Sequence, residues 1–77
     1  MPVAFVLINT EMGSESEVLN ALNKINDVKE AFLVYGVYDI VVKVESKTAE
    51  ELRNIITWNI RKQDKVRSTL TLMTASE

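Results

Sequence analysis

The segment Gly36–Asp39, with the sequence Gly-Val-Tyr-Asp, holds the residue types most suited to chemistry in this chain. It lies between two apolar segments, 31–35 and 40–44, that have the composition of β-strands. Gly36 can adopt the positive φ of a tight turn, and Asp39 supplies the only carboxylate between the two segments. A carboxylate beside exposed turn amides can hold an ammonium group while the amides hold a carboxylate, so the loop predicts a site for a free amino acid. The alternative is a plain turn, in which the aspartate bonds its own backbone.

The composition of the chain excludes several kinds of site. There is no cysteine and no histidine, so disulfides, thiolate or imidazole metal sites, and catalytic dyads or triads that use these residues are ruled out. Glu11, Glu15 and Glu17 lie close in sequence, but acidic residues are favoured near a helix start, so we expect no metal site and no cofactor. With 9 basic and 11 acidic residues, the net charge of −2 gives no electrostatic footprint for nucleic acid or an anionic membrane.

The length of the chain, 77 residues, allows one domain, 1–77, and a core this small favours stabilisation by oligomerisation. The longest apolar run, Val3–Ile8, is too short to span a membrane and lacks the flanks of a signal peptide, which favours a cytoplasmic protein. Hydrophobic periodicity predicts strands and helices in alternation. The strands are expected at 2–8, 28–35, 40–44 and 66–74, and the helices begin with the capping boxes Ser14–Glu17 and Thr48–Glu51 and end near Asn26 and Gln63.

The two halves of the sequence repeat one pattern of strand, capped helix and strand. The capping box Ser14–Glu17 corresponds to Thr48–Glu51, and Val28-Lys29 corresponds to Val66-Arg67 after a helix that is about one turn longer. A βαββαβ order with right-handed crossovers gives a four-stranded antiparallel sheet with both helices on one face. We therefore predict the α+β, ferredoxin-like fold.

The helices can cover only one face of this sheet, yet the strands are apolar on both faces. The segments Val3–Ile8 and 40–42 carry no polar position to mark a solvated face. A second copy is the expected cover, which gives a sheet-to-sheet pairing of the dimeric α/β barrel type. Trp58 lies off the apolar stripe of the second helix, either as an interface anchor or as a ring over the edge of the domain.

The order and spacing of these elements resemble a known family. The Ser-capped helix, the turn Tyr35–Asp39 and the closing strand Val66–Thr71 look like the RAM domain, the effector-binding half of the Lrp/AsnC (feast/famine) transcriptional regulators. The likeness covers essentially the whole chain. Those regulators carry an N-terminal helix-turn-helix domain, whereas here the first strand is expected at Pro2, so the chain looks most like a stand-alone RAM protein.

The resemblance implies a sheet-to-sheet dimer, assembly of dimers into a ring (tetramer to decamer), and a small amino acid bound where dimers meet. Arg67 either neutralises the carboxylate of the ligand or forms a solvated or inter-subunit ion pair, and Thr69 and Thr71 either approach the ligand or are ordinary strand residues. The predicted ligand-binding residues are Gly36, Val37, Tyr38, Asp39, Arg67, Thr69 and Thr71.

Three functions follow, from different classes. The favoured one is an amino-acid sensor and oligomerisation module that regulates amino-acid metabolism or transcription through a partner, such as an Lrp/AsnC-type regulator that bears a helix-turn-helix. The second is a small enzyme of the dimeric α+β barrel type, a monooxygenase or isomerase; without His or Cys its base would have to be Asp39, Glu45 or Tyr38, so we expect no enzyme. The third is a regulator of a metabolic enzyme, similar in role to an ACT domain.

Overall fold

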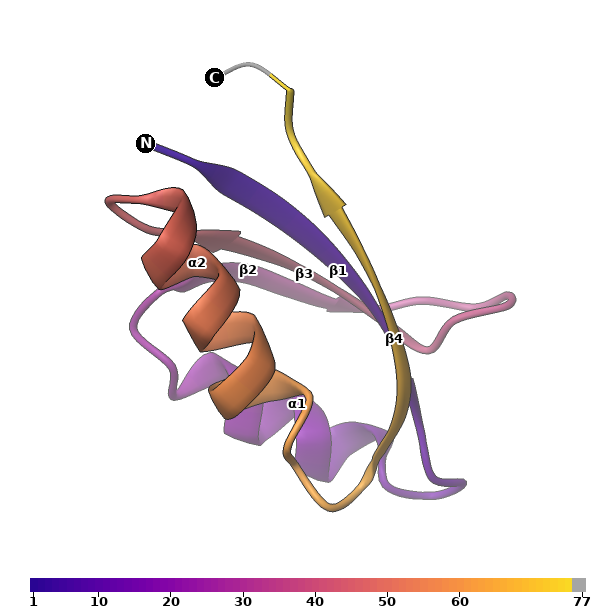
Figure 1. Cartoon of the computed structure of the whole chain (residues 1–77). Coiled ribbons are helices and arrows are strands. Elements are labelled where there is room, and N and C mark those ends of the chain that lie inside the picture. Colours follow the sequence, from indigo (N-terminus) through magenta and orange to yellow (C-terminus); the bar gives the residue numbers. More distant parts are fainter. Residues whose placement is uncertain (76–77) are drawn as a thin grey trace.

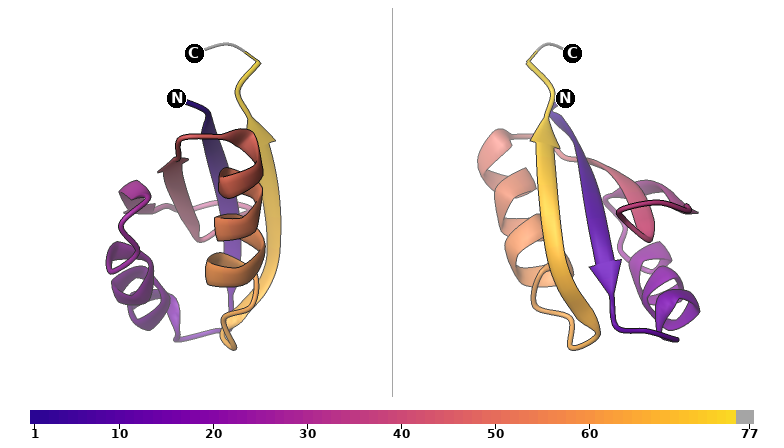
Figure 2. Two further views of the ribbon diagram at one scale, coloured as in Figure 1. Left: turned by 60° about the vertical axis from the view of Figure 1, so that its left-hand side comes forward. Right: turned by 90° about the vertical axis from the view of Figure 1, so that its right-hand side faces the viewer.

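The computed structural model describes residues 1–75 and has the predicted ferredoxin-like architecture (Figure 1). Its elements are β1 (Val3–Thr10), α1 (Glu15–Asn23), β2 (Val28–Leu33), β3 (Ile40–Glu45), α2 (Ala49–Ile55), the π-helical turn η1 (Ile56–Ile60) and β4 (Val66–Met73). The strands form one antiparallel sheet in the order β2-β3-β1-β4, with both helices on the same face (Figure 2). The predicted order of elements and the one-sided helix layer are confirmed.

The core lies between the sheet and the helices. Alternate residues of the two central strands point toward the helices, and their apolar side chains are fully buried. Leu22 of α1, Leu52 of α2 and Ile60 of η1 are buried against them. The fully buried strand residues are Ala4, Val6, Ile8, Ile40, Val42 and Val44.

The two helix starts differ in their caps. The Thr48 hydroxyl accepts a hydrogen bond from the Glu51 backbone N–H at 3.1 Å, as predicted, whereas the Ser14 hydroxyl makes no such bond to α1. The reciprocal bond of a capping box, from the N-cap backbone N–H to the acid three residues later, forms at neither helix within residues 1–75: the Ser14 N–H donates to the Glu11 carbonyl at 2.9 Å, and the Glu51 carboxylate accepts from the Ser46 hydroxyl at 3.2 Å. The capping-box prediction is therefore right only for the Thr48 hydroxyl.

The second helix ends in a widened turn that the sequence pattern did not predict. The Arg61 N–H donates to the Ile56 carbonyl at 2.9 Å, a spacing of five residues instead of four. The turn keeps Ile56 and Ile60 buried and leaves Trp58 63% exposed on the outer side, with the Lys62 ammonium 5.2 Å from the ring centroid. Within the chain, Trp58 is thus a surface residue of the helix layer and lies opposite the open sheet face.

A β-bulge at Arg67 changes the register of β4. Asn9 pairs with Ser68, but the next residue of β1, Thr10, pairs with Val66, so Arg67 is an additional residue without a direct partner on β1. Simple alternation places Val66 on the same face as Ser68. The bulge instead turns Val66 toward the helices, where it packs against the core.

A second bulge occurs at Lys29, at the corresponding point of the other repeat. Val28 pairs with Val44, whereas Glu30 pairs with Lys43, so Lys29 is the additional residue of β2. The correspondence predicted between the two strand starts therefore extends to their backbone geometry. In both repeats, the bulged residue is a cation.

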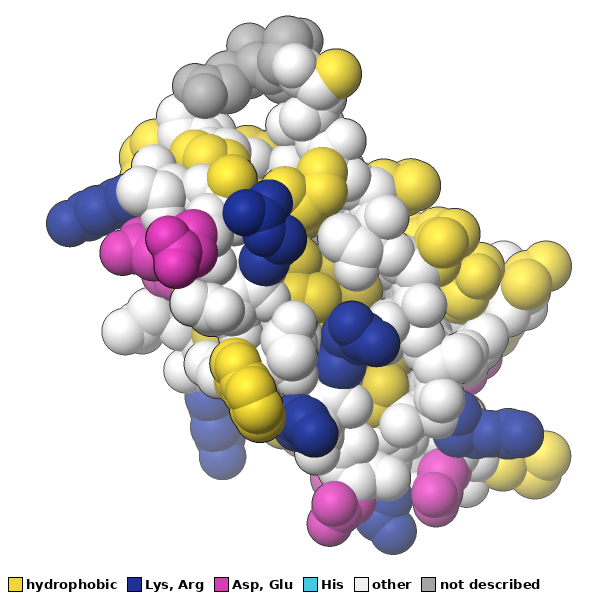
Figure 3. Space-filling model, in the orientation of Figure 1, with side chains coloured by type: hydrophobic (Ala, Val, Ile, Leu, Met, Phe, Trp, Pro, Cys, Tyr) yellow, Lys and Arg dark blue, Asp and Glu magenta, His cyan; other side chains and the backbone are white. Residues whose placement is uncertain are grey.

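The open face of the sheet carries a contiguous apolar patch. Figure 2 (right) shows β1 and β4 with no helix in front of them, and the space-filling view in Figure 3 shows Lys and Arg spread over the helix side. Cross-strand partners share a face, so the register places the members of the patch side by side. The patch consists of Val3, Phe5, Leu7, Phe32, Val41, Leu70 and Leu72, and among these Phe32, Leu70 and Leu72 are 55%, 45% and 51% exposed.

Over residues 1–75, neither helix has the length and apolar character needed to cross a bilayer.

Candidate functional site

The loop between β2 and β3 protrudes from the sheet (Figure 1). β2 ends at Leu33, earlier than the predicted end at Tyr35, and the Val34 N–H donates to the Asp39 carbonyl at 2.8 Å to close the loop. Gly36 has φ +142°, which confirms that this position needs a glycine-like conformation. Tyr35 and Val37 are exposed to solvent, so the tip offers an apolar surface.

Asp39 lies at the base of this loop and joins β3 to β1. One carboxylate oxygen, Oδ2, accepts hydrogen bonds from the Thr10 backbone N–H at 3.0 Å and from the Thr10 hydroxyl at 3.5 Å. The Asp39 N–H in turn donates to the Ile8 carbonyl at 2.9 Å. The carboxylate therefore bonds across the sheet, and it fixes the end of β1 instead of bonding within its own turn.

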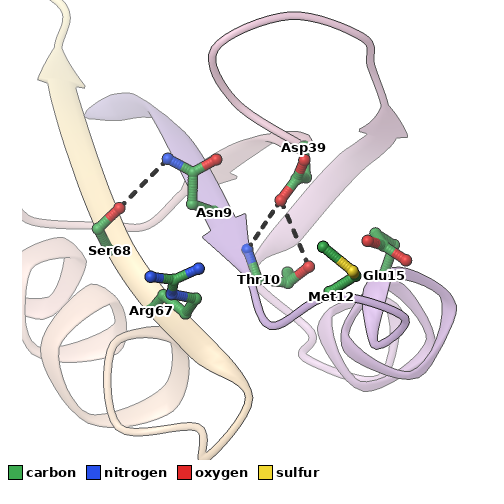
Figure 4. Close-up of a pocket in the computed structure, with 7 residues that line it drawn as sticks. All are labelled: Asn9, Thr10, Met12, Glu15, Asp39, Arg67 and Ser68. Carbon is green, nitrogen blue, oxygen red and sulfur yellow. Dashed lines mark hydrogen bonds between the residues drawn. The ribbon is translucent and has the colours of Figure 1, made fainter.

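Asp39 also lines a hollow of about 450 Å³ between the end of β1, the start of α1 and the bulge of β4 (Figure 4). On its β4 side, the Asn9 amide donates to the Ser68 hydroxyl at 3.3 Å. The hollow is open to solvent, and its size lies in the range of small-molecule sites. Its lining residues are Asn9, Thr10, Met12, Glu15, Asp39, Arg67 and Ser68.

Three charged groups face this hollow without neutralising one another. Arg67 extends from β4 on one side, and Asp39 and Glu15 lie on the other, with Thr10 and Met12 drawn between them (Figure 4). Within residues 1–75, the Arg67 guanidinium forms no ion pair and no hydrogen bond, and no two of these three side chains pair with each other. An arrangement of separated opposite charges can hold a small zwitterion.

The structure brings together two of the predicted ligand-binding residues, Asp39 and Arg67. The loop residues Gly36, Val37 and Tyr38 lie outside the lining of the hollow. Thr69 pairs with Ile8 and Thr71 with Val6, both buried residues, so these threonines point toward the helices. Sequence reasoning did not place Glu15, Asn9, Thr10, Met12 or Ser68 at the site. Polar residues at an expected strand end and beside a helix start are the only signal that could have indicated them.

Two other hollows are less suited to a charged ligand. One, of about 410 Å³, lies on the far side of Asp39 and shares Glu15, but no cation lines it. Another, of about 490 Å³, lies near the β2 bulge; there the Lys29 ammonium already donates to the Asn26 carbonyl at 3.2 Å, and Glu51 is bonded to Ser46. Nowhere in residues 1–75 do three or more acidic side chains gather in a way that could hold a metal ion.

Comparison with known proteins gives full-length matches to small structures. Residues 3–77 match the profile of the Lrp/AsnC ligand binding domain. The crystal structure of FFRP-DM1 superposes with a TM-score of 0.94 at 43% identity, and the match covers 96% of this chain and 99% of that one. The similarity thus extends over almost the full length of both chains.

Longer relatives match over part of their length. The HTH-type transcriptional regulator FL11 of Pyrococcus furiosus is 41% identical over 54 residues, which are 70% of this chain and 36% of the regulator. The homocitrate synthase of Saccharolobus islandicus is 48% identical over 56 residues, 73% of this chain and only 12% of the enzyme. The chain therefore spans about a third of the regulator and a small part of the synthase. On the match of residues 3–77, the chain belongs to the Lrp/AsnC ligand-binding domain family.

Proposed function

We propose that the protein is an amino-acid-binding regulatory module that acts through a partner and has no catalytic role of its own. The observation that carries this proposal is the separation of Asp39 and Arg67 across one hollow, with neither engaged in an ion pair to another of residues 1–75. A free amino acid carries an ammonium and a carboxylate on one carbon atom, and it can contact both groups at once. The family match and the similarity to a transcriptional regulator support the regulatory role.

In this proposal, the ligand ammonium contacts Asp39 and the ligand carboxylate contacts Arg67. The Oδ2 atom of Asp39 is bonded to Thr10, so the Oδ1 atom is the one that remains for the ligand. Charge-assisted hydrogen bonds of this kind are shorter and about twice as strong as neutral ones. The polar pair Asn9 and Ser68 offers further partners for the ligand carboxylate.

The other predicted site residues take a different place in this proposal. Gly36, Val37 and Tyr38 belong to the protruding loop, so we assign them to a junction with a neighbouring subunit that closes over the ligand. Thr69 and Thr71 support the site indirectly, because they hold β4 against β1 on the helix side. This division predicts that loop variants change assembly and binding together.

A second copy is the proposed cover of the open sheet face. The patch around Leu7 and Leu70 is apolar across all the strands, which is unusual for a solvated face. Burial of about 400 Å² of apolar surface per subunit contributes roughly 10 kcal/mol per subunit, before the loss of association entropy is subtracted. Dimers joined at the protruding loops then form the larger ring.

As a partner of a transcriptional regulator, the module acts in the cytoplasm.

Titration calorimetry with the twenty amino acids tests the ligand class. At least one amino acid should bind the wild type. Asp39→Asn should weaken that binding about 10-fold or more, because it removes the negative charge while its amide oxygen still accepts from Thr10. Arg67→Met should weaken it similarly, whereas Arg61→Met, a change of an exposed cation outside the hollow, should not. If no amino acid binds at millimolar concentration, the proposal fails.

A second candidate function is the regulation of a metabolic enzyme. The observation that favours it is the 48% identity to a segment that makes up 12% of a homocitrate synthase. Both candidates use the same ligand site, and they differ in the partner. Affinity purification of the tagged chain with its ligand, followed by mass spectrometry, separates them: a helix-turn-helix regulator supports the first candidate and an enzyme supports the second.

A further inference from the structure

The lining of the hollow carries two carboxylates and one guanidinium, so it has a net negative charge that a neutral amino acid leaves uncompensated. The two groups of a zwitterion account for Asp39 and Arg67, and they leave Glu15 as an additional carboxylate in the same lining. Glu15 and Asp39 lie on the same side of the hollow (Figure 4), and two like charges near each other repel. A ligand that carries a second cation removes this imbalance.

Glu15 is well placed to hold such a cation. It is the first residue of α1 and is half-buried, and its Oε2 atom accepts from the Gly13 N–H at 3.3 Å, which orients the carboxylate. Its Oε1 atom has no donor among residues 1–75. Figure 4 shows Glu15 on the same side of the hollow as Asp39 and opposite Arg67, with Met12 between Glu15 and Thr10.

We propose that the ligand is an α-amino acid with a cationic side chain, such as lysine, ornithine or arginine, and that Glu15 holds the side-chain cation. This inference rests on the proposed function and adds the class of ligand to it. The methylene groups of such a ligand pass Met12, which is exposed and whose flexible thioether side chain adapts to an apolar partner. Each charge in the hollow then has an opposite charge beside it.

The test compares lysine with norleucine, which has the same carbon chain without the terminal ammonium. Calorimetry on the wild type should give a Kd for lysine that is about 5- to 15-fold lower than for norleucine. Glu15→Gln should remove this difference, because the amide can still accept from Gly13 but carries no charge for the side-chain ammonium. Glu17→Gln is the matched control: it removes the other acid from the first turn of α1, outside the hollow, and the preference should remain.

The outcomes separate this inference from the function on which it rests. If norleucine binds as tightly as lysine, or if Glu15→Gln and Glu17→Gln behave alike, the side-chain assignment is overturned while amino-acid binding stands. If neither lysine nor any other amino acid binds, the proposed function itself fails. Thermal unfolding of each variant shows whether a loss of binding comes from a loss of folded protein.

Discussion

The backbone N–H of Thr10 donates to the Asp39 carboxylate at 3.0 Å, so the residue we assign to the ligand ammonium also holds the end of β1 against the start of β3. Thr10 is almost completely buried, so water cannot readily replace the Asp39 carboxylate as the acceptor for its N–H. Asp39 thus combines a structural bond through Oδ2 with a second oxygen, Oδ1, that accepts no hydrogen bond from residues 1–75. A substitution there affects folding and binding through different atoms.

Asp39→Ala should lower the free energy of unfolding by about 1–3 kcal/mol, because it leaves the Thr10 N–H without its acceptor. Asp39→Asn should lose less than about 1 kcal/mol, since its amide oxygen replaces Oδ2. Urea denaturation of both variants measures the difference. Equal stability of the two would show that the bond to Thr10 contributes little.

Leu70→Lys should convert the proposed dimer into a monomer. Leu70 lies beside Leu7 in the middle of the open face, and by symmetry the change buries two unpaired ammonium groups in one apolar interface. The dimer Kd should rise by at least about 100-fold. Light scattering at micromolar concentration measures the mass of each species. Trp58→Lys, on the helix side, is the control and should leave the mass unchanged.

Thr48→Ala should destabilise the protein by about 1 kcal/mol, because the Thr48 hydroxyl caps α2 through the Glu51 N–H. Ser14→Ala should cost no more than about half as much, since the Ser14 hydroxyl makes no cap bond to α1. Urea denaturation of the two variants compares the loss of unfolding free energy at two N-cap positions, one with a side-chain cap bond and one without. A larger loss for Ser14→Ala would contradict the observed cap assignment.

Gly36→Ala should destabilise the protein by about 1–2 kcal/mol through backbone strain at φ +142°. Steric crowding does not contribute, because a Cβ at this position has no heavy atom within 4 Å. Gly13→Asn is a useful comparison: at φ +85° asparagine is tolerated better than other residues, and the loss should stay below about 1 kcal/mol. Thermal unfolding of both variants provides the test. If Gly36→Ala is neutral, the loop is able to change its conformation.

The fold could be predicted because its signals are local and periodic. The apolar runs of β1 and β3 and the helical stripes through Leu22 and Leu52 specify the strands, the helices and the face that each buries. The Ser14 cap was predicted but does not form, and the π-turn at Ile56–Ile60 was not predicted, because hydrogen-bond geometry at a helix end depends on the packing around it. The face of Val66 was also not predictable from the sequence. The bulge turns Val66 to the other face of the sheet, but the polar and apolar alternation of β4 does not indicate that a bulge is present.

The candidate site could be predicted only in part. Asp39 ends a glycine-containing turn and Arg67 is the second residue of an expected strand, so the sequence alone singles out both positions. No sequence motif surrounds Glu15, Asn9 or Ser68. These residues come together only because β1, α1 and β4 converge at one end of the sheet. Their role depends on tertiary contacts between positions far apart in the chain, which a single sequence does not contain.

In the proposed site, the bulge at Arg67 separates the side chain that contacts the ligand from the backbone pairing of the sheet. Because Arg67 is the additional residue of β4, its backbone lies outside the regular pairing between Asn9–Ser68 and Thr10–Val66. Exchange of its side chain therefore leaves the strand pairing intact. If the proposed site is correct, mutation at this one position changes which ligands bind at little risk to folding. Proteins with this same fold can then diverge in the ligand that they detect.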